Sequence, residues 1–594
     1  MIADSKSSAL ANGLPASGAV TLRMLLRNVE PLTLARTMVP GNIIRCNTYL
    51  SGGAIRGALL TAVRSTRPEL TEMLADPKVM SVSNGYVLPS PEGWEAVEAI
   101  PSIPDGWETA ESIPIPLNIR QPKAGGPSSA SGGLTWWTEP SGRGSVFGSR
   151  GEKPCSCNGV EPDKTAEGLK YKRIKTEDYL IRFSPGERWL RHPPRTIILM
   201  RNRVPTKRLD TKWRSAVGSS IAYREDALFS HEALAEDQYF VADVRVSDSA
   251  KAKELLRSLG DHVEGSAEKR AWLRIGRGGK PVVICGLAVA AVASPSTGNN
   301  ACVPPPDSYL TLTATSDWII RTPWLTFVTE PHVQTLAEAF RNAANEYGLR
   351  QLIPEEGIPC EGFSVTGVWE TTEIPGFNRA SGLPRSVAVA IRRGGVLEIR
   401  CEKPETMKVW RTLVLKLGEA GAWLGDRTAE GFGRFAVDLN VVAPASADSI
   451  EPPKLPIPEN ATETILAKVF RFEESQHHEV GGVKTAQWMT LRNVAAAAQA
   501  SDDALDTINR LLGQLKEHAQ RLSGKGGFSS KFLENLKQQL ELVGEVPQSQ
   551  ILFLDSLCRL AVARSRQRAR DLKSGRRQEP SAVPASNQPP GNGI

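Results

Sequence analysis

The stretch Gly425–Leu439, GDRTAEGFGRFAVDL, combines residue types that suit the binding of an anion. Its glycines allow positive backbone φ angles and let a ligand approach the main chain closely. Backbone N–H groups in such a turn can form a concave nest for an anion, and arginines add charge-assisted hydrogen bonds. The alternative is a tight turn with solvated arginines. The binding interpretation selects Arg427, Gly431, Phe432, Gly433 and Arg434.

Two further turns along the chain combine glycine with arginine. Arg274–Gly279, RIGRGG, precedes the apolar run Pro281–Val292. Tyr49–Val63, YLSGGAIRGALLTAV, leads into a helix predicted over Ala54–Ser65, whose first N–H groups lack partners within the helix and suit an anion. The first of these turns adds Arg274, Gly276, Arg277 and Gly278 to the candidate binding residues.

A basic and aromatic run lies between Arg182 and Arg214. It holds ten Lys and Arg residues against two acids, Glu187 and Asp210, and includes two tryptophans. Single-stranded RNA offers phosphates to cations and unstacked bases to aromatic rings, so this composition suits an RNA path. A solvated basic loop is the alternative. The candidates from this run are Arg208 and Trp213.

The order of these motifs resembles the RAMP superfamily of CRISPR-associated proteins. The match extends through Gly376–Ser386 (GFNRASGLPRS), Ala388–Gly395 (AVAIRRGG) and the GDRTAEGFGR loop, and it spans roughly residues 18 to 440. This order is similar to that of the large, two-domain RAMP subunit of type III-D effector complexes. The resemblance implies that the loop 374–386 packs against RNA or an adjacent subunit, which adds Arg379 and Arg385. It also implies that the turn and helix at 49–63 face the RNA, which adds Arg56. Ser51 stands where typical members have proline.

The resemblance implies an α+β fold of two tandem ferredoxin-like (RRM-like) domains with long insertions. It also implies a structural subunit in antiviral defence that holds the 5′ repeat-derived tag of the crRNA. Its partners would be the crRNA, the target RNA indirectly, the backbone RAMP subunits and the large polymerase-like signalling subunit. No catalytic residue is assigned. A cytoplasmic location is expected from the eight scattered cysteines, which suggest reduced thiols.

The predicted domain organisation follows the shifts in composition. Residues 1–17 are expected to be a disordered leader. The first ferredoxin-like domain is assigned to 18–300, with a loop-rich insertion at about 101–170, and the second to 301–441. A proline-rich linker at 442–460 precedes a helical domain at 461–577. That domain has a basic end, in which Arg559–Arg577 holds eight basic residues and one acid. Residues 578–594 are expected to be a disordered tail.

Composition excludes several classes of protein. The chain has 594 residues, a net charge of +7 and 40% hydrophobic residues, and no apolar run approaches the roughly 18 residues that a membrane span needs. Eight dispersed cysteines fit reduced thiols rather than a disulfide framework. Cys155 and Cys157 are one residue apart without a second pair, which departs from the spacing of zinc sites. We therefore predict no cofactor and no metal.

Two other functions stay open from the sequence. Some RAMP proteins are endoribonucleases that process repeat RNA or cut target RNA, and a histidine could serve as a general base. However, His192 and His231 lack a recognisable acidic partner, and Asp210 and Asp226 are acids without a defined role. The third hypothesis is a protein–protein scaffold with a basic tail.

Overall fold

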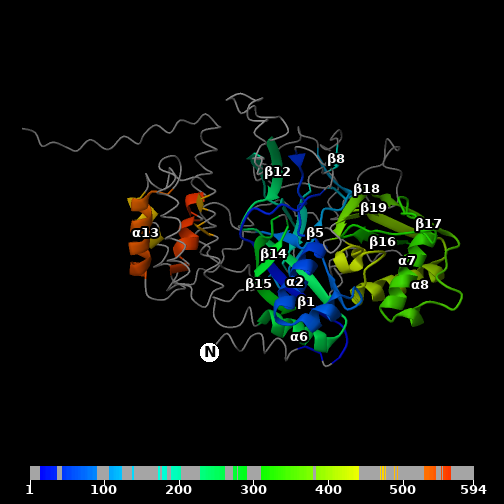
Figure 1. Cartoon of the computed structure of the whole chain (residues 1–594). Helices are drawn as coiled ribbons and strands as arrows, with labels where there is room; N and C mark the ends of the chain where they lie inside the picture. The colour runs from blue at the N-terminus through cyan, green and yellow to red at the C-terminus, as the bar shows by residue number, and fades with distance from the viewer. Residues whose placement is uncertain are drawn as a thin grey trace, which may run out of the picture. The chain divides into compact units, whose positions relative to one another are not determined.

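The computed structural model has two compact units (Figure 1). Unit 1 comprises residues 1–90 and 103–454, and unit 2 comprises residues 91–102 and 455–594. The residues described are 14–15, 17–36, 43–89, 106–122, 137–138, 171–173, 177–183, 189–202, 228–260, 272–276, 278–290, 309–378, 383–439, 468–469, 471–473, 475–476, 487–488, 491–492, 528–543, 550–551, 553–558 and 560–562.

The first domain of unit 1 is built on a six-stranded antiparallel sheet. Its strands run in the order β14-β15-β1-β13-β3, and β4 also pairs with β13. Along the chain, β1, helix α2, β3 with β4, β13, helix α6 and β15 follow the β-α-β-β-α-β pattern of a ferredoxin-like domain. The bounds are β1 Val20–Asn28, α2 Gly52–Thr66, α3 Pro68–Ala75, β3 Met80–Val82, β4 Tyr86–Leu88, β13 Tyr239–Val246, α6 Ser249–Gly260, β14 Trp272–Ile275 and β15 Lys280–Val289.

The second domain repeats this topology in four strands. Their order in the sheet is β17-β20-β16-β21, and all three pairings are antiparallel. Helix α7 follows the first strand and helix α8 follows the third, as the pattern requires. The bounds are β16 Tyr309–Ala314, α7 Val333–Glu346, a short 3-10 turn η3 Arg350–Leu352, β17 Phe363–Val368, β20 Val396–Cys401, α8 Pro404–Glu419, a 3-10 turn η4 Thr428–Glu430 and β21 Phe435–Val437.

Insertions extend both domains. Between β4 and β13 the chain forms short strands that pair mostly with one another, and between β17 and β20 it forms the hairpin β18–β19. Three of the short strands, β5 to β7, fall within the stretch predicted to be loop-rich. The bounds are β2 Ile43–Ile44, β5 Glu111–Pro114, β6 Ile119–Pro122, β7 Trp137–Thr138, β8 Tyr171–Arg173, β9 Tyr179–Arg182, β10 Leu190–His192, β11 Thr196–Asn202, β12 Leu228–Leu234, β18 Thr371–Asn378 and β19 Leu383–Ile391.

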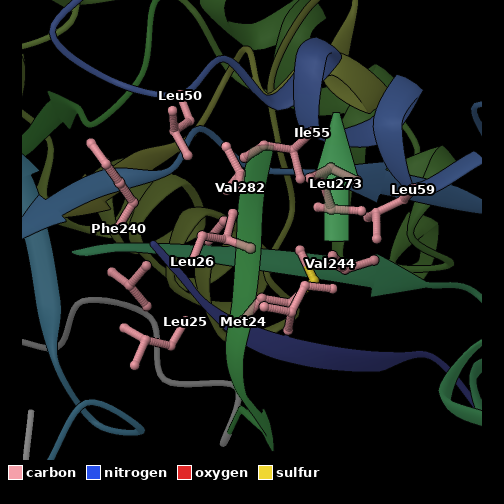
Figure 2. Packing of buried hydrophobic residues seen from close by; sticks show 14 of the residues in the cluster. Met24, Leu25, Leu26, Leu50, Ile55, Leu59, Phe240, Val244, Leu273 and Val282 are labelled. Atoms are coloured by element: carbon pink, nitrogen blue, oxygen red, sulfur yellow. The ribbon is translucent and has the colours of Figure 1, made fainter. Parts of the chain in front are cut away.

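The core of the first domain lies between its sheet and its helices (Figure 2). Leu26 of β1 is fully buried, and Ile55 and Leu59 of α2 join the same cluster as Leu273 of β14. Leu14, from the predicted leader, is also buried in this cluster, and the Ser249 hydroxyl donates a hydrogen bond of 2.5 Å to the Pro15 carbonyl. The amphipathic pattern of α2 therefore places the glycine–arginine turn at one end of a packed helix.

The described residues of unit 2 are helical, with a separate core. Helix α13, Ser530–Val543, buries Phe532, Leu536 and Leu540. Trp488 packs edge-on against Phe528 and Phe532. The predicted α+β class, with two ferredoxin-like domains and additional helices, is confirmed. Among the described residues, no helix has the length and apolarity that crossing a membrane would require.

Leu26→Ala tests the central position of β1. Removing this buried side chain leaves a cavity between sheet and helices, so the free energy of unfolding should fall by about 2–5 kcal/mol. Denaturant unfolding followed by circular dichroism measures this change. The same substitution at Leu542, which is 71% exposed, should have little effect; equal effects of the two substitutions would contradict the assigned core.

Candidate nucleic-acid interface

The predicted phosphate loop connects helix α8 to strand β21 through the 3-10 turn η4. Arg427 lies just before η4 with φ 58°, in the left-handed region, and Gly431 follows η4 with φ 97°. Gly433 also has a positive φ, of 86°. Such angles cost a residue with a side chain about 1–3 kcal/mol, which explains the two glycines after η4.

This loop packs directly on the start of α2 in the first domain. A Cβ atom added at Gly52 would lie 2.1 Å from the Val82 carbonyl oxygen and 2.6 Å from the Glu430 carbonyl oxygen. A Cβ atom at Gly431 would lie 2.8 Å from Asn84 Oδ1, the atom that accepts a hydrogen bond from the Gly52 N–H. The two glycine motifs therefore meet at one seam between the ferredoxin-like domains.

Several of the loop's backbone donors are used inside the protein. Five of its N–H groups donate to acceptors within unit 1. The N–H groups of Asp426, Glu430, Gly431 and Gly433 donate to the carbonyls of Ile319, Arg427, Thr428 and Asp317, respectively. The Arg434 N–H donates to the Ser316 hydroxyl. These five groups are not available to an anion: three donate to the segment 316–319, and the N–H groups of Glu430 and Gly431 close the turn η4 itself. The arginine side chains of the loop are the stronger candidates for ligand contacts.

Two predicted arginines converge on the carboxylate of Glu430. Arg385, at the start of β19, donates to Oε1 over 2.6 Å, and Arg427 donates to Oε2 over 2.7 Å. The carboxylate also lies beside Gly53, near the start of α2. Burial alone would raise the pKa of Glu430, but the hydrogen bonds and charges of Arg427 and Arg385 hold it below its ordinary value. Glu430 is therefore an anion that holds two cations at the seam.

The aromatic residue of the loop anchors it to the β18–β19 hairpin. Phe432 is 7% exposed and shares a hydrophobic cluster with Ile374 and Ala388 of the hairpin. The guanidinium of Arg427 lies 4.9 Å from the centre of the Phe432 ring. Phe432 is thus buried behind the arginines, whereas the side chain of Arg385 stays 45% exposed.

Arg434 links the loop to the first sheet. It donates to Asp243 Oδ2 over 3.0 Å, and Arg23 of β1 donates to Asp243 Oδ1 over 2.8 Å. Burial alone would raise the pKa of Asp243, but the two arginines lower it to about 2. The arginine side chain is 29% exposed. Arg434 therefore joins the two domains through Asp243, and only part of its guanidinium is accessible to a ligand.

The other predicted RNA-binding residues that the structure describes are either bonded within the first domain or exposed at a turn. Arg56 donates to the backbone carbonyls of Met80, Leu74 and Ala75, and thereby ties α2 to the end of α3. Arg274 and Gly278 are exposed at the β14–β15 turn, where Gly276 packs on Leu32 and Thr33. Four predicted binding residues, namely Arg208, Trp213, Arg277 and Arg379, lie outside the described residues, as do Cys155 and Cys157.

Sequence reasoning missed a buried polar cluster on the same seam. Arg393 of the RRGG motif forms ion pairs with Glu177, at 3.2 Å, and with Asp317, at 3.3 Å. Its guanidinium lies 4.3 Å from the centre of the Tyr49 ring. Arg36 and Arg392 also pair with Glu177. The consecutive arginines in RRGG were the available signal, but their acidic partner lies more than 200 residues away in the chain.

Three tyrosines line this cluster. Tyr86 donates to the Thr315 carbonyl over 2.5 Å, and its ring centre lies 5.2 Å from that of Tyr179. Burial raises the pKa of Tyr179 to about 12 and raises the pKa of Tyr49 and Tyr86 as well. These phenols stay protonated near neutral pH, so they act as hydrogen-bonding and packing groups between the domains.

The histidines and acids of the described chain show no assembled metal centre. His231 lies within β12 and is 4% exposed. Within the described residues, no group of three or more His, Cys, Asp or Glu side chains is placed to hold a metal ion. Asp210 and Asp226, the acids of the nuclease hypothesis, lie outside those residues.

The class defined by the strand order is a tandem pair of ferredoxin-like domains. No family model and no curated protein matches the sequence. Solved structures that resemble the chain include a Cas6-related protein from Pyrococcus furiosus, at 8% identity, a TM-score of 0.26 and coverage of 71% of this chain and 98% of the other. Another, a RAMP protein binding different RNA substrates, gives 9% identity, a TM-score of 0.28, and 70% and 99% coverage.

A third solved structure is a type III-B Cmr-beta complex bound to cognate target RNA and AMPPnP. The matched chain is 11% identical, with a TM-score of 0.28 and coverage of 67% of this chain and 92% of the other. Because all three TM-scores are low, the assignment of ferredoxin-like topology to this chain rests on its own strand order.

Gly52→Ala tests the close contact at the seam. Its Cβ atom would meet two backbone carbonyls at distances that real Cβ atoms do not occupy, so the α2 start or the loop must move apart. We expect a destabilisation of about 1–3 kcal/mol and faster limited proteolysis between the domains.

Gly57→Ala is the matched control on the same helix. A Cβ atom at Gly57 meets nothing within 4 Å, and alanine is the better helix former by about 1 kcal/mol. This variant should be as stable as the wild type or more stable. If both variants behave alike, the seam does not depend on the absence of a Cβ atom at Gly52.

Asp243→Asn tests the ion pairs with Arg23 and Arg434. Because the folded-state pKa of Asp243 is depressed to about 2, its ionised form contributes stability above about pH 4, and this contribution is lost as the pH falls toward 2. The variant should be less stable than the wild type by about 2 kcal/mol or more at pH 7, and this difference should shrink toward pH 2. Urea unfolding across this pH range measures the difference.

Asp426→Asn is the control for this pH dependence. Asp426 forms an ion pair with Arg321 but is 44% exposed, so its loss should change the stability by under about 1 kcal/mol. A gap between Asp243→Asn and the wild type that stays constant from pH 7 to pH 2 would contradict the ionic role of Asp243.

Proposed function

We propose that this chain is a RAMP-superfamily, RNA-binding subunit of a type III-D CRISPR ribonucleoprotein. In this role it holds the 5′ repeat-derived tag of the crRNA and nucleates assembly with the backbone and large signalling subunits. The proposal rests on the order of the glycine–arginine motifs together with the tandem ferredoxin-like topology. It places the protein in antiviral defence in the cytoplasm.

The observation that carries the proposal is the cation pair held by Glu430. Arg385 from the second domain's hairpin and Arg427 from its glycine-rich loop share one carboxylate beside the start of α2. A bridging carboxylate is a chemical analogue of a phosphate group, because both present anionic oxygens to two guanidinium groups. An RNA phosphate that reaches this seam can therefore take over the bonds that Glu430 accepts.

If an RNA phosphate replaces the Glu430 carboxylate in this way, the protein contacts the RNA through arginine side chains. The loop's internal hydrogen bonds fix the positions from which Arg385 and Arg427 extend, while five of its N–H groups are already satisfied. Contacts of guanidinium groups with phosphates carry no sequence information and weaken with salt through counterion release. A subunit that holds RNA mainly through the phosphates of the RNA backbone needs this kind of contact.

We further propose that the role is binding rather than cleavage. The three tyrosines of the seam are buried, Tyr86 and Tyr179 are also hydrogen-bonded, and His231 is buried in β12. Neither position leaves a general base beside the exposed arginines. The processing or target-cutting endoribonuclease remains the alternative to be tested in the same experiments, with RNA length as the readout.

Arg385→Ala should weaken RNA binding. Because Arg385 is 45% exposed at the seam, its loss removes about one phosphate contact, so the dissociation constant should rise several-fold, up to about tenfold. The slope of log K against log salt should become shallower by about 0.7. Fluorescence anisotropy of the full chain with labelled single-stranded RNA, at several salt concentrations, measures both quantities.

Two further variants make this test discriminating. Glu430→Gln removes the competing anion and should tighten binding, which is the opposite sign. Arg341→Ala removes an exposed arginine that also pairs with a glutamate, Glu338, but lies on α7, and it should leave binding unchanged. Equal losses for Arg385→Ala and Arg341→Ala would indicate only a general charge effect and would overturn the assignment of the seam.

Crosslinking tests the placement of the 5′ tag. In a reconstituted complex, a photoreactive nucleotide in the crRNA tag should crosslink to peptides containing Arg427 or Arg385. Crosslinks confined to the basic segment Arg559–Arg577 would instead favour the scaffold hypothesis with a basic tail. Shortened crRNA or target RNA in the same reaction would favour the nuclease hypothesis.

A further inference from the structure

A rigid turn in the second domain presents two large apolar side chains to solvent. Trp324 is 87% exposed and its neighbour Leu325 is 71% exposed. Hydrogen bonds close the turn: the Thr322 N–H donates to the Thr326 carbonyl over 2.9 Å, and the Leu325 N–H donates to the Thr322 carbonyl over 2.9 Å. Leu325 has a φ of 63°, a left-handed conformation that costs a leucine about 1–2 kcal/mol.

The base of this turn is fixed to the glycine-rich loop. The guanidinium of Arg321 lies 4.6 Å from the centre of the Phe327 ring and forms an ion pair of 2.5 Å with Asp426. The Asp426 N–H donates to the Ile319 carbonyl over 2.7 Å. The backbone that carries the two exposed side chains is therefore held in place before any partner arrives, which lowers the entropy cost of binding.

A pocket of about 460 Å³ adjoins the turn. Leu325 lines one side and Trp423, which is 5% exposed, lines another. The polar lining is dominated by carboxylates, with Glu338 and Glu346 from α7 and Asp426 from the loop, against the single guanidinium of Arg321. Asp426 is paired with Arg321 and Glu338 with Arg341, so Glu346 is the carboxylate of the lining that is left to attract a cation and repel a phosphate.

We propose that the Trp324–Leu325 turn and this pocket form a docking site for a partner protein. The recognised segment carries an arginine or lysine next to an apolar residue. Its cationic side chain enters the pocket toward Glu346, and its apolar side chain covers Trp324 and Leu325. This site goes beyond the proposed RNA contact and does not depend on it.

Charge and geometry favour a protein over RNA at this site. Trp324 could stack on an unpaired base, but phosphates attached to that base would approach Glu346, while Asp426 and Glu338 already occupy the nearby arginines. An apolar surface beside an anionic pocket instead matches a peptide in which a cation is flanked by aliphatic groups. The volume also lies within the usual range of ligand pockets, roughly 300–1,000 Å³.

Fluorine NMR of the full chain labelled with 5-fluorotryptophan tests this inference. Trp324→Phe assigns the Trp324 resonance. The probes are the peptides acetyl-Leu-Arg-Leu-amide and acetyl-Leu-Glu-Leu-amide, and a uridine hexanucleotide. The arginine peptide should shift the Trp324 resonance saturably with a dissociation constant of about 1 mM, and the glutamate peptide and the RNA should not.

Variants localise the effect without disturbing the fold. Glu346→Lys should weaken binding of the arginine peptide at least about tenfold, whereas Lys416→Ala, a surface change on α8, should leave it unchanged. The thermal melting of Glu346→Lys should match that of the wild type, because Glu346 is exposed. The proposal is overturned if no shift occurs up to about 10 mM, if both peptides act equally, or if the RNA alone shifts the resonance.

Discussion

The absence of a side chain at Gly52 is the constraint on which the rest of unit 1 depends. It lets the start of helix α2 lie against the carbonyls of Val82 and Glu430. That contact sets how the second domain meets the first, and with it the positions of Arg385, Arg427 and Arg434. A methyl group at this one position would separate the elements that the proposed function brings together.

The seam also contains more buried charge than a simple hydrophobic contact between domains. Asp243 joins Arg23 to Arg434, and Glu177 gathers Arg36, Arg392 and Arg393. Buried ion pairs contribute little net stability because desolvation offsets their attraction, but an unpaired partner is costly. These pairs therefore penalise every arrangement of the domains in which the charges do not meet, and so favour one relative orientation.

The same constraint changes how the phosphate loop is understood. A glycine-rich loop can bind an anion with its backbone, or it can bring two parts of a protein into close contact. Here five backbone donors are satisfied within unit 1, and the Glu430 carboxylate lies between Arg385 and Arg427. The loop thus combines a structural role for its glycines with a binding role for its arginines, and these roles are separable by substitution.

The sequence by itself indicated the class of fold through the order of its glycine–arginine motifs, which carries the resemblance to two tandem ferredoxin-like domains. The helix predicted over Ala54–Ser65 lies within α2, because a helical pattern depends on neighbours a few residues apart. The glycine–arginine motifs were also visible, since their chemistry lies in consecutive residues. Only the tertiary structure decided which donors stay free, because Gly433 meets Asp317 and Arg434 meets Asp243 across more than 100 residues. Burial and long-range pairing are set by packing, and one-dimensional spacing does not encode them.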